Sequence, residues 1–248
     1  MALPFGLSPA EAAFLLAAVL GAAVIRGFSG FGFSALVVAA TGLVSDPLNA
    51  VAVVLFCEVV MTLQAANGIA GQVDWRRVWL LLAGAAVGLP LGVHGLIALG
   101  LDASRLVISL FILVMCGVLL AGWTLPREVR GWPNAVLGLA SGVANGAAMA
   151  GLPVAAFFSA QPIPPKVFRA TLIAYFAILD LFSLPVLFQA GLLTRDSVLA
   201  TVFAVPLLLL GNHFGAYRFA KSAPKGFRRL AIGLLAVLAV LGLVKSVI

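Results

Sequence analysis

The sequence alternates between long apolar runs and short stretches that hold most of its charged residues. The runs are about 20 residues long, which is the length that an α-helix needs to cross a bilayer, and they lack the alternation of membrane-spanning strands. Charges and helix breakers mark the boundaries of eight segments. These predicted segments are residues 9–44, 47–68, 76–99, 104–122, 133–160, 166–190, 195–217 and 228–247. The pattern therefore predicts an all-α integral membrane protein.

The first and fifth segments are interrupted by glycine-rich sequence. A straight helix over residues 9–44 would be about 54 Å long, nearly twice the thickness of the hydrocarbon core, which is about 30 Å. The interruptions read RGFSGFGFS from Arg26 and NGAAMAGLP from Asn145. Because glycine is a poor residue for a helix interior, each interruption is expected to end one helix and begin another at membrane depth.

The two interruptions coincide when the chain is compared with itself at an offset of 119 residues. The equivalent pairs are Arg26 and Asn145, Gly27 and Gly146, Gly32 and Gly151, Gly92 and Gly211, and His94 and His213. A single offset that aligns matching residues in two separate parts of the chain indicates an internal duplication. We therefore predict two four-segment repeats, residues 1–122 and 133–248, joined by a polar linker at 123–132.

The basic residues of the loops predict how the chain threads through the membrane. If the first and fifth segments each crossed once, Lys and Arg would divide almost evenly between the two sides. If both are hairpins that enter and leave by the same side, only Arg105, Arg195 and Lys245 fall outside. The inner residues are then Arg76, Arg77, Arg127, Arg130, Lys166, Arg169, Arg218, Lys221, Lys225, Arg228 and Arg229. Each repeat then has three crossings, so the two repeats are expected to be inverted, as in many secondary transporters.

Composition narrows the class of protein. Hydrophobic residues make up 63% of the chain and charged residues 9%, whereas soluble domains average about 25% charged residues. The net charge of +7 is spread over short loops, so no nucleic-acid partner is expected. Cys57 and Cys116 lie in apolar runs, and neither metal-ligand spacing, a phosphate-binding loop nor a catalytic triad is present, so we expect no metal, no cofactor and no enzyme activity. The small residues 84–88 are expected to allow close helix packing.

Candidate chemistry gathers at the two interruptions. Helices broken at membrane depth offer unpaired backbone N–H groups and positive dipole ends, which suit an anion. Arg26 adds a planar fork of donors for carboxylate, sulfonate or phosphate oxygens. The predicted substrate-binding residues are Arg26, Gly27, Ser29, Gly30, Gly32, Ser34, Asn145, Gly146 and Gly151. The alternatives are an Arg that reaches the membrane interface, and Ser or Asn side chains that only cap their own backbone.

Four other ionisable groups lie in apolar runs and are candidates for proton coupling: Glu58, Asp180, His94 and His213. Glu58 and Asp180 occupy nearly equivalent places in the two repeats. A carboxyl group in the membrane can carry a proton, or it can be a buried ion-pair partner, for example Glu58 with Arg26. For the two His residues, the alternative is a packed ring satisfied by one hydrogen bond.

The sequences RGFSGFGFSALVVA at 26–39 and NGAAMAGLPVAAFF at 145–158 resemble the duplicated glycine-rich breaks of the sulfite exporter TauE/SafE family of membrane permeases. The resemblance extends over essentially the whole chain, including the four-plus-four organisation and the linker. It implies transport of small sulfur-containing anions, such as sulfite, sulfoacetate or other sulfonates, by a multi-pass protein of a bacterial inner membrane. The residues themselves indicate an anion, without distinguishing sulfonate from carboxylate.

Together these features predict an ion- or proton-coupled secondary transporter whose partners are a small anionic substrate and the lipid bilayer. The alternatives are a passive anion channel that uses the same half-helix ends, a transporter of carboxylates, and a membrane partner protein that transports nothing. A homodimer is left open by the sequence.

Overall fold

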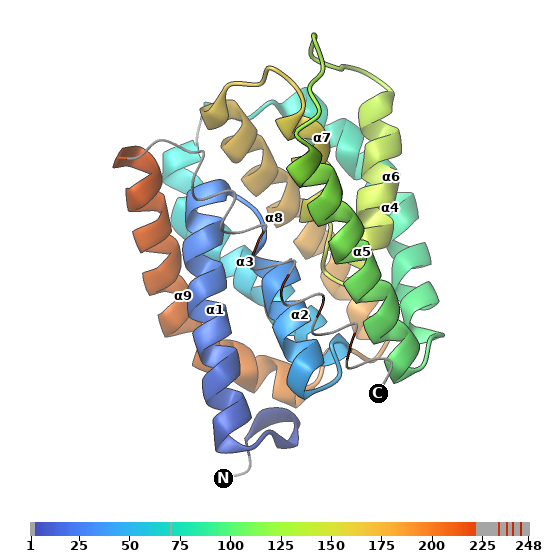
Figure 1. The fold of residues 1–248 in the computed structure, drawn as a ribbon, viewed down its shortest axis with the longest axis vertical. Coiled ribbons are helices and arrows are strands. Elements are labelled where there is room, and N and C mark those ends of the chain that lie inside the picture. The colour runs from blue at the N-terminus through green and yellow to red at the C-terminus, as the bar shows by residue number, and fades with distance from the viewer. Residues whose placement is uncertain are drawn as a thin grey trace.

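The structure is a computed structural model that describes residues 3–69 and 71–221, with the isolated residues 233, 237, 240 and 244. The regular structure of this part is helical throughout, and Figure 1 shows the helices side by side in one bundle. A short 3₁₀-helix covers Pro4–Gly6. The α-helices are α1 (Pro9–Ser29), α2 (Phe33–Val44), α3 (Leu48–Ile69), α4 (Trp75–Ile97), α5 (Leu101–Ala121), α6 (Pro133–Asn145), α7 (Gly151–Ser159), α8 (Pro165–Gln189) and α9 (Arg195–Lys221). Apart from the isolated residues, the eighth predicted segment, 228–247, lies outside the described residues, as do Lys225, Arg228, Arg229 and Lys245.

Both predicted interruptions are present. Residues 9–44 are divided into α1 and α2, and residues 133–160 into α6 and α7. Within the described residues, six helices are long and apolar enough to cross a membrane: α1, α3, α4, α5, α8 and α9. The two broken segments differ in length, because α1 has 21 residues and α6 has 13. The first arm is thus long enough to cross by itself, which the sequence pattern did not predict.

Local sequence signals explain why α1 begins at Pro9 and ends at Ser29. Ser8 and Glu11 form a capping box, in which each side chain accepts a hydrogen bond from the other residue's backbone N–H, and Pro9 occupies the first helical position. At the other end Gly30 has a φ of 85°, a left-handed conformation that glycine adopts without strain. The helix therefore ends where the sequence turns glycine-rich.

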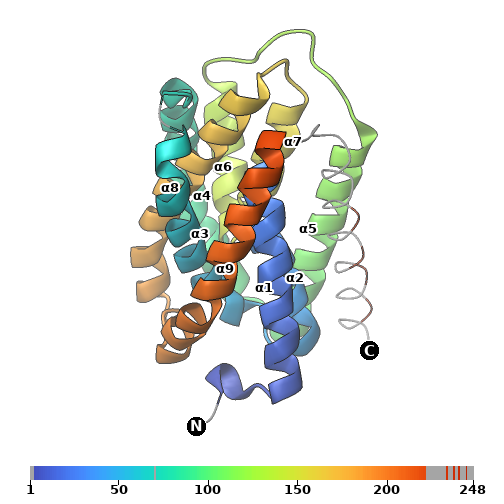
Figure 2. The same cartoon turned by 90° about the vertical axis from the view of Figure 1, so that its left-hand side faces the viewer.

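Glycine brings α4 against α6 and α9 against α1. A Cβ atom at Gly84, Gly88 or Gly92 would lie 1.9–2.2 Å from a backbone oxygen of α6, and one at Gly215 would lie 2.1 Å from the Val24 oxygen of α1. Close backbone approach drives helix association in lipid, which offers no hydrophobic contrast. The packing role predicted for residues 84–88 is confirmed at Gly84 and Gly88. Figure 2 shows α1 and α9 lying along each other.

The helices change direction at each successive loop, so each of α1, α2, α3 and α4 runs opposite to its counterpart four helices later, α6, α7, α8 and α9 respectively, when the single helix α5 is left out of the count (Figure 1). The glycine contacts agree with this arrangement. Gly84, Gly88 and Gly92 face Ala135, Leu139 and Val143 in the same order, so α4 and α6 are parallel. Gly211 and Gly215 face Leu20 and Val24, so α9 and α1 are also parallel.

One end of the bundle, which we call the basic end, carries nearly all the loop cations. The α3–α4, α5–α6 and α7–α8 connections meet there, because the Leu125 N–H donates to the Ala160 oxygen at 2.6 Å and the Asp74 N–H donates to Thr171 Oγ1 at 3.0 Å. Its described cations are Arg76, Arg77, Arg127, Arg130, Lys166, Arg169, Arg218 and Lys221. The opposite end has only Arg105 and Arg195 among the described residues. All four Trp residues, 75, 79, 123 and 132, are exposed at the basic end, as expected at a membrane interface.

The linker after α5 is tied to this end by ion pairs. Glu128 Oε2 lies 3.0 Å from Arg77 Nη2 and 2.9 Å from Arg130 Nη2. The hydrogen bond from Arg130 and the charges of both guanidinium groups hold the pKa of the Glu128 carboxyl below its usual range. The carboxylate is therefore ionised at neutral pH and holds the linker against α4.

Candidate anion-binding site

The first helix break is made by two glycines on either side of Phe31. Gly30 and Gly32 both have left-handed φ values, 85° and 95°, so the chain reverses within three residues. The helix α2 then begins near the middle of the bundle without a side-chain cap, as does α7 after the second break. The N–H groups of their first turns therefore lack side-chain partners, which suits an anion.

The second break contains a strained residue instead of a left-handed glycine. Ala148 has a φ of 56°, one of two positive values among the described non-glycine residues. Such values are uncommon for alanine and cluster at functional sites. The Asn145 amide donates to Ser183 Oγ at 2.9 Å, which holds the end of α6 against α8.

Arg26 is completely buried beside the first break. Its Nε donates to Glu58 Oε2 at 2.6 Å and its Nη2 to Thr62 Oγ1 at 2.9 Å, while its Nη1 has no hydrogen-bond partner within the part of the chain that the structure describes. The Ser34 hydroxyl donates to the other Glu58 oxygen at 3.2 Å. Arg26 therefore makes the ion pair with Glu58 that the sequence suggested, and it keeps one unused donor.

Asp180 on α8 faces this group from the second half of the chain. Its Oδ2 is buried and has no hydrogen-bond partner among the described residues, and Asp180 lies close enough to Glu58 and Arg26 for their charges to interact. A small cavity lies between the two breaks. It is lined by Phe31, Gly32, Ser34, Glu58, Asn145, Ala148, Ala150, Gly151, Phe176 and Asp180. Its roughly 10 Å³ of space holds about one water molecule, which is less than an oxyanion needs.

The structure thus brings seven of the predicted residues together and places the others elsewhere. Gathered at the cavity or directly behind it are Arg26, Gly32, Ser34, Glu58, Asn145, Gly151 and Asp180. Gly27 and Gly146 lie in helix contacts, where an added Cβ would be 2.2 Å from the Asn212 oxygen and 2.4 Å from the Gly92 carbonyl carbon. The Ser29 hydroxyl donates to the backbone oxygens of Ile25 and Phe31, which is the capping alternative.

The two His residues lie away from the cavity. His94 on α4 and His213 on α9 are both exposed on the outer surface of the described bundle. His94 Nδ1 is 2.8 Å from the Pro90 oxygen one turn earlier. Their proposed part in proton coupling stays a prediction, and Gly30, which packs against Arg169, lies outside the cavity wall.

Four side chains at the site were missed from sequence. Thr62 follows Glu58 by one helical turn and Ser183 follows Asp180 by three residues, so helical spacing placed them on the right face. Phe31 and Phe176 gave no signal, because aromatic residues are frequent throughout the apolar runs. Within the described residues no group of three or more His, Cys, Asp or Glu side chains could hold a metal ion.

A second, larger cavity opens at the basic end, and we call it the vestibule. It is lined by Phe28, Ser29, Phe31, Phe158, Ser159, Gln161, Ile163, Pro165, Phe168, Arg169 and Phe219, with about 200 Å³ of space. Phe31 belongs to the walls of both cavities. It is 5% exposed, and its ring packs edge to face on Phe168 with the ring centres 6.4 Å apart. Phe31 is therefore the side chain between the vestibule and the central cavity.

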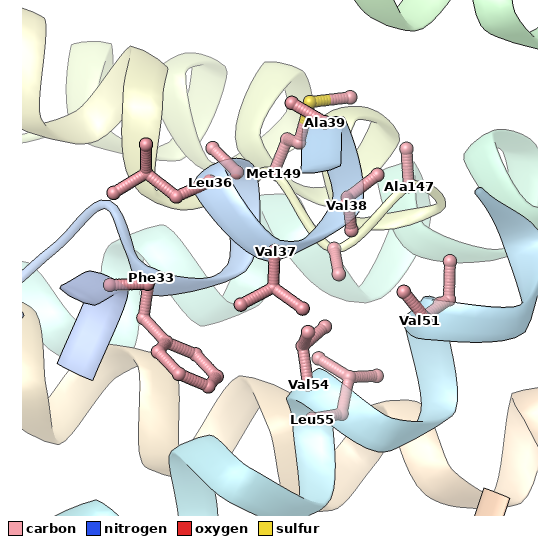
Figure 3. Packing of buried hydrophobic residues seen from close by; sticks show 14 of the residues in the cluster. Phe33, Leu36, Val37, Val38, Ala39, Val51, Val54, Leu55, Ala147 and Met149 are labelled. Atoms are coloured by element: carbon pink, nitrogen blue, oxygen red, sulfur yellow. The ribbon is translucent and has the colours of Figure 1, made fainter. Parts of the chain in front are cut away.

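Toward the end of the bundle opposite the basic end, α2 lies in tight apolar packing. Figure 3 shows the side chains of α2 between α3 and the loop that joins α6 to α7. The labelled residues are Phe33, Leu36, Val37, Val38, Ala39, Val51, Val54, Leu55, Ala147 and Met149, all of them at most 6% exposed. The structure therefore has a vestibule on the basic side and a packed barrier on the opposite side.

Comparison with known proteins identifies one match. A family model described as sulfite exporter TauE/SafE matches residues 14–242, which include both breaks and every described transmembrane helix except the start of α1. No curated protein and no solved structure gives a significant match.

Proposed function

The chain belongs to the sulfite exporter TauE/SafE family of membrane transporters, and from this premise we propose that it is a secondary carrier of small sulfur-containing anions. The observation that carries the proposal is Arg26, fully buried with an unused Nη1 donor beside two uncapped helix N termini. A buried guanidinium is costly in a membrane protein, so an intramembrane Arg with a spare donor is a site for an anion. Sulfite, sulfoacetate and other sulfonates offer the oxygens that such a fork binds.

We further propose that the two halves are inverted repeats around this site. Each helix of the first half runs opposite to its counterpart in the second half. The 119-residue offset relates α1 to α6 and α4 to α9, so the contact of α1 with α9 corresponds to the contact of α6 with α4. Gly27 against Asn212 and Gly146 against Gly92 and Val93 are the corresponding close approaches. Under this proposal one broken hairpin enters from each face of the membrane and reaches the substrate, as in other secondary transporters.

The closed central cavity favours a carrier over an open channel. A channel needs a continuous path, whereas here Phe31 closes one side and the packed barrier of Figure 3 closes the other. Alternating access would require Phe31 to move when the central cavity opens to the basic end. It would require α2 to separate from the α6–α7 loop when the cavity opens to the opposite end. The distribution of Lys and Arg supports an orientation with the basic end in the cytoplasm, and we propose that this is the cytoplasm of a bacterial cell.

A thermal-shift screen tests the proposed function. Purified protein is heated with sulfite, methanesulfonate, isethionate, sulfate, acetate or propionate at matched ionic strength. An anion that binds the folded state at 100 times its Kd adds about 2.7 kcal/mol of stability, so a sulfur oxyanion is expected to raise the apparent Tm by several degrees. If none of the panel raised the Tm, the proposal would fall. Stabilisation by the carboxylates alone would assign the protein to carboxylate transport instead.

We propose that Asp180 carries the coupling proton. Glu58 and Asp180 together place two carboxylates around one guanidinium, so an incoming anion meets net repulsion until one carboxylate is neutralised. Protonation of Asp180 removes that repulsion, and the anion and the proton then bind together.

Asp180→Asn is expected to imitate the protonated state. In proteoliposomes a proton gradient should accelerate net sulfite transport by the parent protein several-fold, because a bound proton favours a bound anion. The gradient should not change net transport by Asp180→Asn, although this variant should still exchange sulfite for sulfite across the membrane. Asp102→Asn, at an exposed position of the opposite end, is the control and should respond like the parent. Full stimulation of Asp180→Asn by the gradient would show that the proton is carried elsewhere.

A further inference from the structure

The vestibule at the basic end contains one cation, Arg169, that makes no ion pair within the described residues. Its Nη2 donates to the Gly27 oxygen at 2.9 Å, and its guanidinium lies over the Phe219 ring at 5.1 Å. Its Nε is buried, and no described residue accepts a hydrogen bond from it. The bond from Nη2 caps the end of α1, and the Phe219 ring contacts the face of the guanidinium. Neither contact uses the Nε donor or supplies a negative charge.

Arg169 stands next to the break that separates the two cavities. Its Cγ would be 3.1 Å from a Cβ at Gly30, and Gly30 is bonded directly to Phe31. Phe31 lies between two left-handed glycines, in the short turn that joins α1 to α2. An anion bound at Arg169 would therefore lie beside Phe31, the side chain that must move before the anion can enter the central cavity.

The rest of the vestibule wall is largely aromatic. Five Phe residues line it: Phe28, Phe31, Phe158, Phe168 and Phe219. The polar neighbours are already engaged, since the Ser29 hydroxyl bonds to the backbone of its own turn and the Gln161 amide bonds to Phe157 and Val129. One charged fork in an aromatic wall suits a ligand with an anionic head and a small apolar body.

We propose that the vestibule is a second anion-binding site, in which Arg169 holds the sulfonate head of a small organosulfonate and the Phe side chains contact its organic group. This inference rests on the proposed function and names the substrate class at its access route. About 200 Å³ of space admits a short alkyl or a phenyl sulfonate, which the central cavity of this conformation does not. The two sites are distinct because Arg26 lies behind the central cavity and Arg169 lies in the vestibule.

A cysteine-protection experiment tests the second site. Ser159→Cys places a reporter thiol in the vestibule wall, and the neutral reagent methyl methanethiosulfonate measures its accessibility. The parent chain gives the background, because its two cysteines, Cys57 and Cys116, are buried. Benzenesulfonate is expected to slow the modification in a saturable manner, and methanesulfonate to do so at higher concentration because it lacks the phenyl group.

Matched Arg variants show which residue holds the anion. Arg169→Gln in the Ser159→Cys background should raise the half-protecting concentration of benzenesulfonate about tenfold or more, because a charge-assisted hydrogen bond is lost. Arg218→Gln is the control: this Arg also stands at the basic end, 5.8 Å from the centre of the Phe214 ring, but outside the vestibule, so protection should be unchanged. Equal loss of protection in both variants would reduce the effect to general electrostatics and overturn the second site.

Two further variants complete the test. If Arg169→Gln does not fold, Arg169→Lys, which keeps the charge without the fork, is expected to raise the half-protecting concentration several-fold, and an unchanged value counts against the site. Protection should persist in Arg26→Lys, since that residue serves the central site. Protection without transport would overturn the proposed function alone, whereas transport without protection would overturn the vestibule site alone.

Discussion

Replacing Arg26 by Lys is expected to lower the initial rate of sulfite transport in proteoliposomes about a hundredfold. Lys keeps the charge, but it replaces a planar fork by a point donor on a flexible chain. The unused Nη1 of Arg26 carries two N–H groups, and the loss of two charge-assisted hydrogen bonds from them, at about 1.5 kcal/mol each, corresponds to about that factor. The measurement is the initial uptake of radiolabelled sulfite at a fixed amount of reconstituted protein.

Two controls separate a binding defect from a folding defect. Arg218→Lys makes the same chemical change at an exposed position of the basic end, and it should transport like the parent. The double variant Arg26→Gln with Glu58→Gln removes both charges of the buried pair, so it avoids leaving an unpaired carboxylate in the bundle. It is expected to fold and to remain inactive. Normal transport by Arg26→Lys would show that the anion binds elsewhere.

Replacing Gly88 by Ala is expected to cost about 3 kcal/mol or more in the free energy of unfolding. The added Cβ would lie 2.2 Å from the Leu139 oxygen and 2.9 Å from the Val143 nitrogen, and both are backbone atoms of α6. Because backbone cannot rotate away as a side chain can, α4 and α6 must separate along their length, which exceeds the cost of ordinary overpacking. Thermal unfolding of the purified protein measures the loss.

Gly95→Ala is the matched control on the same helix. Nothing lies within 4 Å of a Cβ at Gly95, so alanine there should leave the Tm unchanged or raise it slightly through its better helix propensity. The difference between the two variants isolates the α4–α6 contact from the general effect of changing a helical glycine. If both variants melted at the same temperature, the close approach of these helices would be wrong.

The sequence predicted the helical elements well because the bilayer imposes a simple rule. Runs without charges had to become helices, and the glycine-rich breaks had to interrupt segments too long for the hydrocarbon core. The predicted segment 47–68 is Leu48–Ile69 in the structure, and 166–190 is Pro165–Gln189. The first segment begins at residue 9 both in the prediction and in the structure, and the capping box at Ser8 is the short-range signal that fixes this start.

The site was predicted only in part because sequence spacing does not determine which face of a break meets the cavity. Gly27 and Gly146 were predicted from the same glycine-rich pattern as Gly32 and Gly151. They lie in helix contacts, however, where the backbones of α9 and α4 approach them closely. Which glycine packs and which lines a cavity depends on tertiary contacts between halves of the chain. The position of Arg169 beside Gly30, 139 residues away in sequence, could not be read from either segment alone.

The carboxylates show the same limit in a different form. The ion pair between Glu58 and Arg26 could be anticipated, since both are ionisable groups in apolar helices of the first half of the chain. The meeting of Asp180 with that pair depends on how α3 packs against α8 across the two halves. The result is a group of two carboxylates and one guanidinium, which is more acidic than Arg26 alone suggested and is the reason why we propose that a proton binds together with the anion.

Counterflow in proteoliposomes is the most direct test of a carrier with its substrate site at Arg26. Vesicles that contain the parent protein are preloaded with unlabelled sulfite and diluted into radiolabelled sulfite. A carrier with one central site predicts faster entry of label than into empty vesicles, a rate that saturates with concentration, and loss of both properties in Arg26→Lys. Label entry that rises linearly with concentration, ignores preloading and is unchanged in Arg26→Lys would contradict it.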